Sequence, residues 1–283
     1  MINSFELHPE FLELDCRTNR PPECGIKMSN DITIQKHKLF LPPEKIAGKT
    51  ILDIGCFIGQ TADWCVSNGA KSYTGIEISP EFVAIAHKLM NKYHGNSNSW
   101  TITNQGIDDF LKESTEKYDI VFFWGVIFGL HDHMWYLNEI AKCTDHLVID
   151  SRHPKLMWNG NQDSISEEFW HELEYNIPYQ EWQAGVMTTT ATVNGSVRVT
   201  AANSSLAAIR LMMELNGFEC NHTNYEVLKS MFPNNFGMQR DPNYLGRFAL
   251  ECTRSDQVKK YDLCDEIFKD PELYRKNFVN WNK

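Results

Sequence analysis

The sequence predicts an α/β fold built on a doubly wound, Rossmann-like sheet. Short apolar and β-branched runs alternate with helical segments between residues 49 and 150, a pattern typical of a parallel sheet. These apolar runs lack polar alternation, as expected where helices cover both faces of the sheet. The chain has 283 residues, of which 42% are hydrophobic and 23% charged, so it is long enough to bury one such core and carry additional segments.

Turn and cap residues set the order of the expected elements. Asn68 and Gly69 are typical of a helix end, and Ser79 and Pro80 are typical of a helix start. The expected strands cover 49–54, 72–78, 100–104, 118–124 and 147–150. The expected helices cover 60–67, 80–93, 107–114 and 133–143.

After Asp150 the alternation stops. Residues 153–203 form an aromatic-rich insertion, in which two β-branched runs joined by Asn194 and Gly195 predict a β-hairpin. Asn203 and Ser204 are expected to cap the next helix. That helix, over 206–215, is followed by two expected strands, 218–222 and 247–253.

The chain is expected to divide into three regions. Residues 1–48, which contain paired prolines, form an irregular N-terminal extension that caps the core. Residues 49–254 form the main domain, with 153–203 inserted in it as either a lid over the substrate or a dimer surface. Residues 255–283 form a polar tail with helical stretches.

The glycine-containing loop after the first strand predicts a ligand site. Gly55 and Gly59 let the backbone approach a ligand closely, and the acid Asp53 suits a cationic ligand better than a pyrophosphate. Glu77 ends the second strand, where a carboxylate can accept hydrogen bonds from both hydroxyls of a ribose. These residues together predict a site for a nucleoside that carries a positive charge and no diphosphate.

Three segments, GKTILDIGCFIGQ, TGIEIS and YDIVFFWGVIF, make the chain resemble the class I S-adenosylmethionine-dependent methyltransferases. The nearest branch is that of the tRNA wobble-uridine carboxymethyltransferases and their uncharacterised small-molecule relatives. The resemblance covers residues 48–152 and resumes at 204–252. It implies a seven-stranded sheet whose last strand is antiparallel, with S-adenosylmethionine as the cofactor.

The resemblance also implies roles for individual residues. Glu77 would hold the ribose, Ile78 and Ile107 would enclose the adenine, and Asp108 would lie near the adenine edge. Phe57 stands where the family often has a small residue. The implied cofactor-binding residues are Asp53, Gly55, Cys56, Phe57, Gly59, Glu77, Ile78, Gly106, Ile107, Trp124 and Gly125.

Residues after the fourth and fifth strands are candidates for the chemistry. His131 and His153 are the candidate bases, and Asp150 and Arg152 end the fifth strand, where an arginine can clamp a carboxylate. A helix cap and a salt-bridged loop are the alternative interpretations of these two segments. No metal site is expected, because His131, Asp132 and His133 offer too few converging ligands.

Charge and composition limit the partners. The net charge of −10 argues against a broad nucleic-acid surface, and the eight cysteines show no metal-site spacing. The start is not a signal peptide and no apolar run is long enough to span a bilayer, so a cytoplasmic protein is expected.

We therefore expect methyl transfer to an oxygen or nitrogen atom of a small molecule, with a homodimer as an option. The alternatives are a tRNA wobble-uridine-type transferase, an enzyme that uses the aminocarboxypropyl arm of the same cofactor, and a non-catalytic cofactor-binding protein.

Overall fold

The computed structural model of the 283-residue chain describes residues 6–14, 30–152, 186–193, 196–204, 206–222 and 247–256. His153 and most of the expected insertion and tail lie outside these residues. None of the described helices combines the length and the apolar character needed to cross a bilayer.

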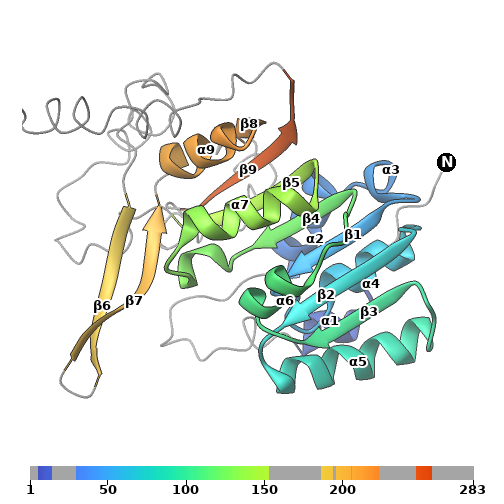
Figure 1. Cartoon of the computed structure of the whole chain (residues 1–283). Coiled ribbons are helices and arrows are strands. Elements are labelled where there is room, and N and C mark those ends of the chain that lie inside the picture. Colours follow the sequence, from blue (N-terminus) through green and yellow to red (C-terminus); the bar gives the residue numbers. More distant parts are fainter. Residues whose placement is uncertain are drawn as a thin grey trace, which may run out of the picture.

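A seven-stranded sheet forms the centre of the molecule, in the order β3-β2-β1-β4-β5-β9-β8 (Figure 1). Strands β1 to β5 pair in parallel, whereas β9 is antiparallel to both β5 and β8. This arrangement confirms the predicted fold class, including the antiparallel last strand. The strands are β1 (Thr50–Ile54), β2 (Ser72–Glu77), β3 (Trp100–Asn104), β4 (Ile120–Trp124), β5 (His146–Arg152), β8 (Phe218–His222) and β9 (Arg247–Arg254).

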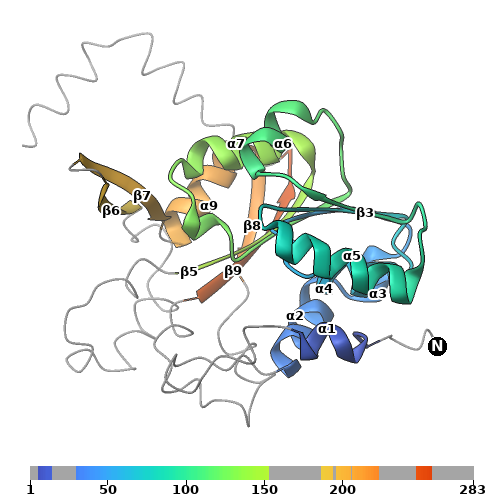
Figure 2. The same ribbon diagram turned by 90° about the horizontal axis from the view of Figure 1, so that it is seen from below.

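Helices cover both faces of this sheet (Figure 2). One face carries α4 (Gln60–Ser67) and α5 (Pro80–His94), together with the helices of the N-terminal segment. The other carries α6 (Ile107–Glu113), α7 (His133–Cys143) and α9 (Leu206–Leu215). Both faces of the central strands are therefore buried, which explains their continuous apolar sequences.

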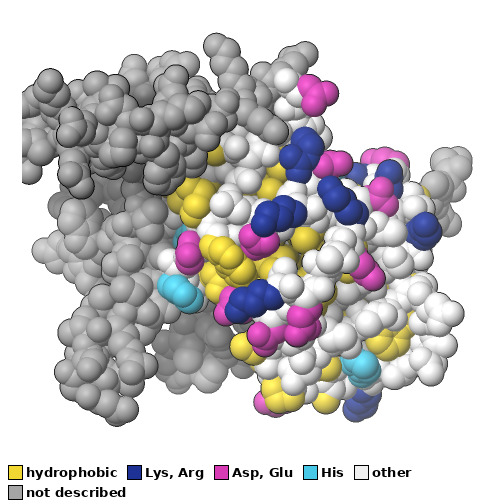
Figure 3. Space-filling view, in the orientation of Figure 1, with side chains coloured by type: hydrophobic (Ala, Val, Ile, Leu, Met, Phe, Trp, Pro, Cys, Tyr) yellow, Lys and Arg dark blue, Asp and Glu magenta, His cyan; other side chains and the backbone are white. Residues whose placement is uncertain are grey.

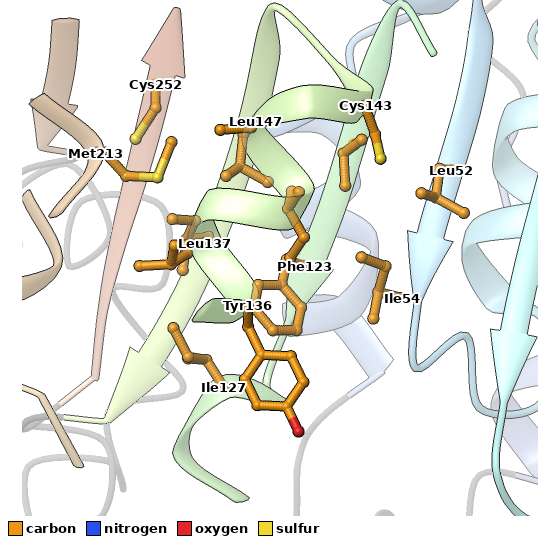
Figure 4. Close-up of a cluster of buried hydrophobic side chains, with 14 of the residues drawn as sticks. Leu52, Ile54, Phe123, Ile127, Tyr136, Leu137, Cys143, Leu147, Met213 and Cys252 are labelled. Atoms are coloured by element: carbon orange, nitrogen blue, oxygen red, sulfur yellow. The ribbon is translucent and has the colours of Figure 1, made fainter. Parts of the chain in front are cut away.

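Each face has its own apolar cluster. On the α7 side, Phe123 of β4 lies among Ile54, Leu137 and Met213, all essentially without solvent exposure (Figure 4). On the α4 side, Trp64 belongs to a second buried cluster that includes side chains of β1, β4 and β5. The β1–β4 part of the sheet thus forms a rigid support for the loops at its carboxyl edge.

Local signals in the sequence correctly placed the start of α5. The Ser79 hydroxyl accepts a hydrogen bond from the Phe82 amide at 3.4 Å, and Pro80 is the first helical residue. Because α5 follows directly after β2, this cap also fixes where Glu77 lies relative to the helix.

The prediction of an irregular N-terminal extension was wrong for the described part of residues 1–48. This part contains α1 (Pro9–Glu13), α2 (Asn30–Phe40) and α3 (Pro43–Ile46). On α2, the side chains of Thr33, His37 and Phe40 are buried at helical spacing. Two of these three residues are polar, so the sequence lacks the apolar periodicity that reveals an amphipathic helix.

The predicted hairpin forms a separate two-stranded sheet of β6 (Val186–Val193) and β7 (Ser196–Ser204). Strand β7 continues through Asn203 and Ser204, which were expected to cap α9. Instead, the Ser204 hydroxyl lies 2.7 Å from Nδ1 of His133, and both side chains are buried. This contact joins the end of the hairpin to the start of α7.

Candidate cofactor and active site

The loop between β1 and α4 is held against the end of β2. The amides of Gly55 and Cys56 both donate to the Ile76 carbonyl, at 2.9 and 3.0 Å. Gly55 and Gly59 have φ angles of 81° and 85°, a region that favours glycine. The loop therefore has the left-handed backbone that its glycines predict.

Phe57 adopts a glycine-like conformation in the same loop. Its φ angle is 51°, which is uncommon for a bulky residue. Its amide donates to Oε2 of Glu77 at 3.0 Å, and its ring contacts that of Phe82 with a centroid separation of 4.5 Å. The backbone at position 57 thus has a left-handed conformation, although the residue there is a phenylalanine and not a glycine.

Glu77 is oriented by two backbone groups. Besides the Phe57 amide, its carboxylate accepts the amide of Ser79 on Oε1 at 2.9 Å. Each carboxylate oxygen retains a lone pair for a further donor. The neighbouring Ile78 is 76% exposed, which leaves an apolar surface next to these acceptors. Carboxylate oxygens that can accept hydrogen bonds from hydroxyl groups, beside an apolar surface, fit the ribose and the adenine of S-adenosylmethionine.

The other residues expected near the adenine lie at the start of α6. Gly106 is the N-cap residue, and the half-buried Ile107 packs against the apolar cluster on the α7 side. Asp108 accepts a hydrogen bond from the Tyr136 hydroxyl at 2.5 Å. The Asp108 carboxylate is thus tied to α7, which was not expected from the sequence.

Asp53 lies inside the domain beneath the loop. Its side chain accepts a hydrogen bond from the buried Tyr73 hydroxyl at 2.7 Å. Burial raises the pKa of Asp53 to about 7, an effect that bonds from Tyr73 and Thr61 only partly offset and that the charge of Glu77 reinforces. Burial likewise raises the pKa of the Cys56 thiol, so this residue is suited to packing and not to nucleophilic chemistry.

The raised pKa of Asp53 predicts a pH-dependent stability. The folded state binds this proton more tightly than the unfolded state, whose pKa lies near the ordinary 3.8. The contribution is therefore complete below about pH 4 and is lost as the pH rises through about 7. We expect Asp53→Asn to remove about 2 kcal/mol of the decrease in unfolding free energy between about pH 5 and 8.

Urea unfolding of both proteins at the two pH values measures this difference. Asparagine keeps the shape of the side chain and an acceptor for Tyr73, so the comparison isolates the proton. Parallel pH dependences for the two proteins would show that Asp53 is ionised throughout this range.

The ends of β4 and β5 bring together three residues from distant parts of the chain. Trp124 and Asp150 are register partners on the two strands, and Lys36 of α2 reaches both of them. The Lys36 nitrogen lies 4.2 Å from the centre of the Trp124 ring and 3.9 Å from Oδ2 of Asp150. No local pattern pointed to Lys36, because it lies in the segment that was expected to be irregular. Gly125, with a φ angle of 70°, directly follows Trp124 and donates its amide to the Asp150 carbonyl.

The side chains of the three consecutive residues 131–133, which follow β4, have different environments. His131 is exposed, with its ring nearly perpendicular to that of Tyr136, whereas His133 is buried beside Ser204. Asp132 caps α7 by accepting the Trp135 amide at 3.0 Å. The helix-cap interpretation therefore describes Asp132, and His131 and Asp132 are exposed whereas His133 is not.

Strand β5 ends with the remaining candidates. Asp150 is buried, and Arg152 is the last residue of the strand, although its side chain and all of His153 lie outside the described structure. Between them, the Ser151 hydroxyl is buried and has no hydrogen-bond partner within the described residues. A buried hydroxyl of this kind can bond to a ligand or an ordered water.

Comparison with known proteins identifies the family. Residues 30–189 match the model of a methyltransferase domain. A tRNA U34 carboxymethyltransferase of Methylococcus capsulatus is 31% identical over 98 residues, which are 35% of this chain and 29% of that protein. The corresponding protein of Cronobacter sakazakii is 27% identical over 123 residues, 42% of this chain and 36% of that protein. The similarity thus spans about a third of the length of these curated relatives.

Solved structures share the fold. A Listeria monocytogenes protein assigned as an S-adenosylmethionine-dependent methyltransferase has a TM-score of 0.55 at 17% identity, covering 81% of this chain and 100% of its own. An S-adenosylmethionine-dependent methyltransferase from Mesorhizobium loti has a TM-score of 0.54 at 13% identity, covering 79% and 98%. Because the methyltransferase-domain match spans more than half of the chain, the protein belongs to the class I S-adenosylmethionine-dependent methyltransferase family.

Proposed function

We propose that this protein transfers the methyl group of S-adenosylmethionine to an oxygen or nitrogen atom of a small molecule. The observation that carries the cofactor half of the proposal is the oriented carboxylate of Glu77. Two amides fix it at the carboxyl edge of the sheet, beside the exposed Ile78. In open α/β sheets, ligands bind at this edge.

The residues around Glu77 have distinct roles in this proposal. Glu77 accepts the ribose hydroxyls, Ile78 and Ile107 enclose the adenine, and Asp53 supports the cationic end of the cofactor from beneath the loop. The remaining contacts come from backbone and short loops: Gly55, Cys56, Phe57, Gly59, Gly106, Trp124 and Gly125. When bound, S-adenosylmethionine supplies an electrophilic methyl group, so the protein's main task is to align the acceptor with it.

The acceptor would approach from the ends of β4 and β5. Trp124 offers an aromatic surface there, and Lys36 and Asp150 offer one charge of each sign. Where the acceptor is a hydroxyl, a base assists by removing its proton, and His131 and His153 are the candidates for this role. Asp150 and Arg152 would orient polar groups of the acceptor.

Charge supports a small acceptor over a nucleic acid. The net charge is −10, and on the face seen in Figure 3 the described Lys and Arg side chains are interspersed with Asp and Glu. Binding to tRNA generally requires a continuous basic surface, because most of its affinity comes from phosphate contacts.

A tRNA modifier is the second candidate, and the curated relatives favour it. The two relatives compared above act on tRNA U34, according to their names. The shared region, however, is the part that would hold the cofactor, and the same cofactor domain serves unrelated acceptors.

A methyl-labelled cofactor distinguishes these possibilities. The full-length chain is incubated with S-[methyl-³H]adenosylmethionine and either the small-molecule filtrate or the bulk tRNA of a cell extract. We expect tritium to appear in compounds of the filtrate and S-adenosylhomocysteine to form, both at reduced rates with Glu77→Ala. The variant controls for label transferred by contaminating enzymes.

The other outcomes assign the alternatives. Label in tRNA that declines steeply with salt would identify the tRNA modifier and overturn the small-molecule proposal. Release of methylthioadenosine would indicate transfer or cyclisation of the aminocarboxypropyl arm. Cofactor binding with neither product, across both fractions, would overturn methyl transfer and leave either a binding protein or a transferase of another group, such as the carboxymethyl group that the relatives' names specify.

A further inference from the structure

Three side chains from distant parts of the sequence converge on the helical face that carries α4 and α5. His8 precedes α1, Asp63 lies in the first turn of α4, and His94 is the last residue of α5. Oδ1 of Asp63 lies 2.7 Å from Nδ1 of His8 and 2.7 Å from Nε2 of His94. The three potential ligand atoms all lie within 4.8 Å of one another. Local sequence patterns cannot reveal this cluster, because its members are 31 to 55 positions from Asp63.

The cluster places a carboxyl group in the interior. The Asp63 side chain has no solvent exposure, whereas His8 is 25% exposed and His94 is 11% exposed. No lysine or arginine in the described part of the chain lies within ion-pair distance of Asp63. A buried carboxylate needs a compensating charge, since burial of an unpaired charge is very costly. The partly exposed imidazoles leave a route by which a cation can enter.

The donor set indicates which cation fits. Two imidazole nitrogens and one carboxylate oxygen are typical ligands of Zn²⁺ and related first-row transition ions, whereas Mg²⁺ and Ca²⁺ prefer oxygen ligands alone. Zn²⁺ binds such atoms at about 2.0–2.1 Å in tetrahedral geometry, which places its ligand atoms about 3.4 Å apart. Small side-chain shifts would therefore let the three atoms surround one ion.

Neighbouring groups already hold the ligands in place. The His8 amide donates to Oδ2 of Asp63 at 2.8 Å, which leaves Oδ1 directed at the two imidazoles. The Tyr93 ring stacks on the His8 ring with a centroid separation of 3.9 Å. Contacts of this kind fix the orientation of ligands in metal sites.

From this geometry we infer that His8, Asp63 and His94 bind one divalent transition-metal ion of the Zn²⁺ type, with water completing its coordination. The ion takes the place of the two hydrogen bonds between the imidazoles and Oδ1 of Asp63. It joins the segment before α1 to α4 and α5. None of the three ligands is among the residues assigned to the cofactor, although the Asp63 amide donates to the carbonyl of Gly59 at 3.0 Å. This inference does not depend on the proposed methyltransferase activity.

Metal titration of the full-length, untagged protein tests the inference. After treatment with a chelator, we expect isothermal calorimetry to show one equivalent of Zn²⁺ bound with saturation. Co²⁺ should give visible absorption bands of an ion bound to nitrogen and oxygen ligands. Excess Zn²⁺ should raise the Tm by roughly 5 °C, as expected for a ligand at about 100 times its Kd.

Substitutions locate the site. His8→Gln and His94→Gln should each weaken Zn²⁺ binding at least tenfold, because each removes one of three ligands. His87→Gln is the matched control on α5, and it should leave the affinity unchanged, since this histidine contacts the Ile102 carbonyl instead. Asp63→Asn tests the carboxylate, provided that the variant retains the helical circular dichroism of the wild type.

Two results would overturn the inference. One is the lack of saturable Zn²⁺ binding by the wild-type protein, which would make the cluster a hydrogen-bonded triad only. The other is saturable binding that survives in both His8→Gln and His94→Gln. S-Adenosylhomocysteine affinity should be unchanged in the two histidine variants, which keeps this test independent of the proposed function.

Discussion

Replacing Glu77 with alanine is expected to weaken the binding of S-adenosylhomocysteine at least tenfold. The carboxylate is the acceptor that we assign to the ribose hydroxyls, and hydrogen bonds to a charged group contribute about 1.5–3 kcal/mol. A loss of this size corresponds to a factor of about 10–100 in affinity. Isothermal calorimetry on the full-length protein measures it.

Two comparisons separate ribose binding from an indirect effect on the loop. Glu77 also accepts the amides of Phe57 and Ser79, so its removal could shift the loop itself. The wild type should therefore bind a 2′,3′-dideoxy analogue of S-adenosylhomocysteine more weakly than S-adenosylhomocysteine itself. Glu77→Ala should bind the two ligands with equal affinity. Glu81→Ala, at an exposed acid in the first turn of α5, should leave affinity within twofold. Unchanged affinity in Glu77→Ala would show that another group holds the ribose.

Replacing Gly55 with alanine is expected to cause the largest loss of stability of any variant considered. Its φ angle of 81° is unfavourable for alanine, and the new Cβ atom would lie 2.3 Å from Cγ2 of Val126. A left-handed conformation costs about 1–2 kcal/mol for a residue with a Cβ, and crowding in a packed region costs about 1–3 kcal/mol more. We therefore expect unfolding in urea to show a loss of about 2–5 kcal/mol, together with a marked loss of cofactor affinity.

The two causes can be measured separately. Val126→Ala removes the atom that Cβ would meet, so the double variant should recover the crowding cost but not the backbone cost. Gly129→Ala is the matched control, because among the described residues other than its chain neighbours no heavy atom lies within 4 Å of its added Cβ, and its φ angle is not left-handed. An equal loss in Gly55→Ala with and without Val126→Ala would mean that the loop moves away from Val126 without cost.

The part of the fold predicted well is the part with strong local patterns. Strand β3 was predicted to the residue, because three consecutive β-branched residues lie between Trp100 and Asn104. Helix α5 was placed by Ser79 and Pro80, whose preference for helix starts arises within a single turn. Such patterns act over a few residues, so they can be read without knowing the tertiary structure.

The sequence-based predictions were wrong where the buried residues are polar. His37 and Thr33 are buried on α2, and the His37 ring lies 3.1 Å from the Thr61 hydroxyl of α4. Ser204 likewise ends in the interior beside His133, where its hydroxyl meets an imidazole and not a helix terminus. A polar residue becomes a core residue only when a distant partner bonds it, and the sequence does not name that partner.

By itself, the sequence determined the alternation of strands and helices, the glycine loop and the position of Glu77 at a strand end. These depend on interactions between near neighbours along the chain. The tertiary structure alone decided that Lys36 reaches Trp124 and Asp150, that Asp53 is buried against Tyr73, and that His8, Asp63 and His94 meet. The physical reason is that each of these contacts joins residues that approach one another only after the helices have packed on the sheet, and both burial and pKa depend on that packing.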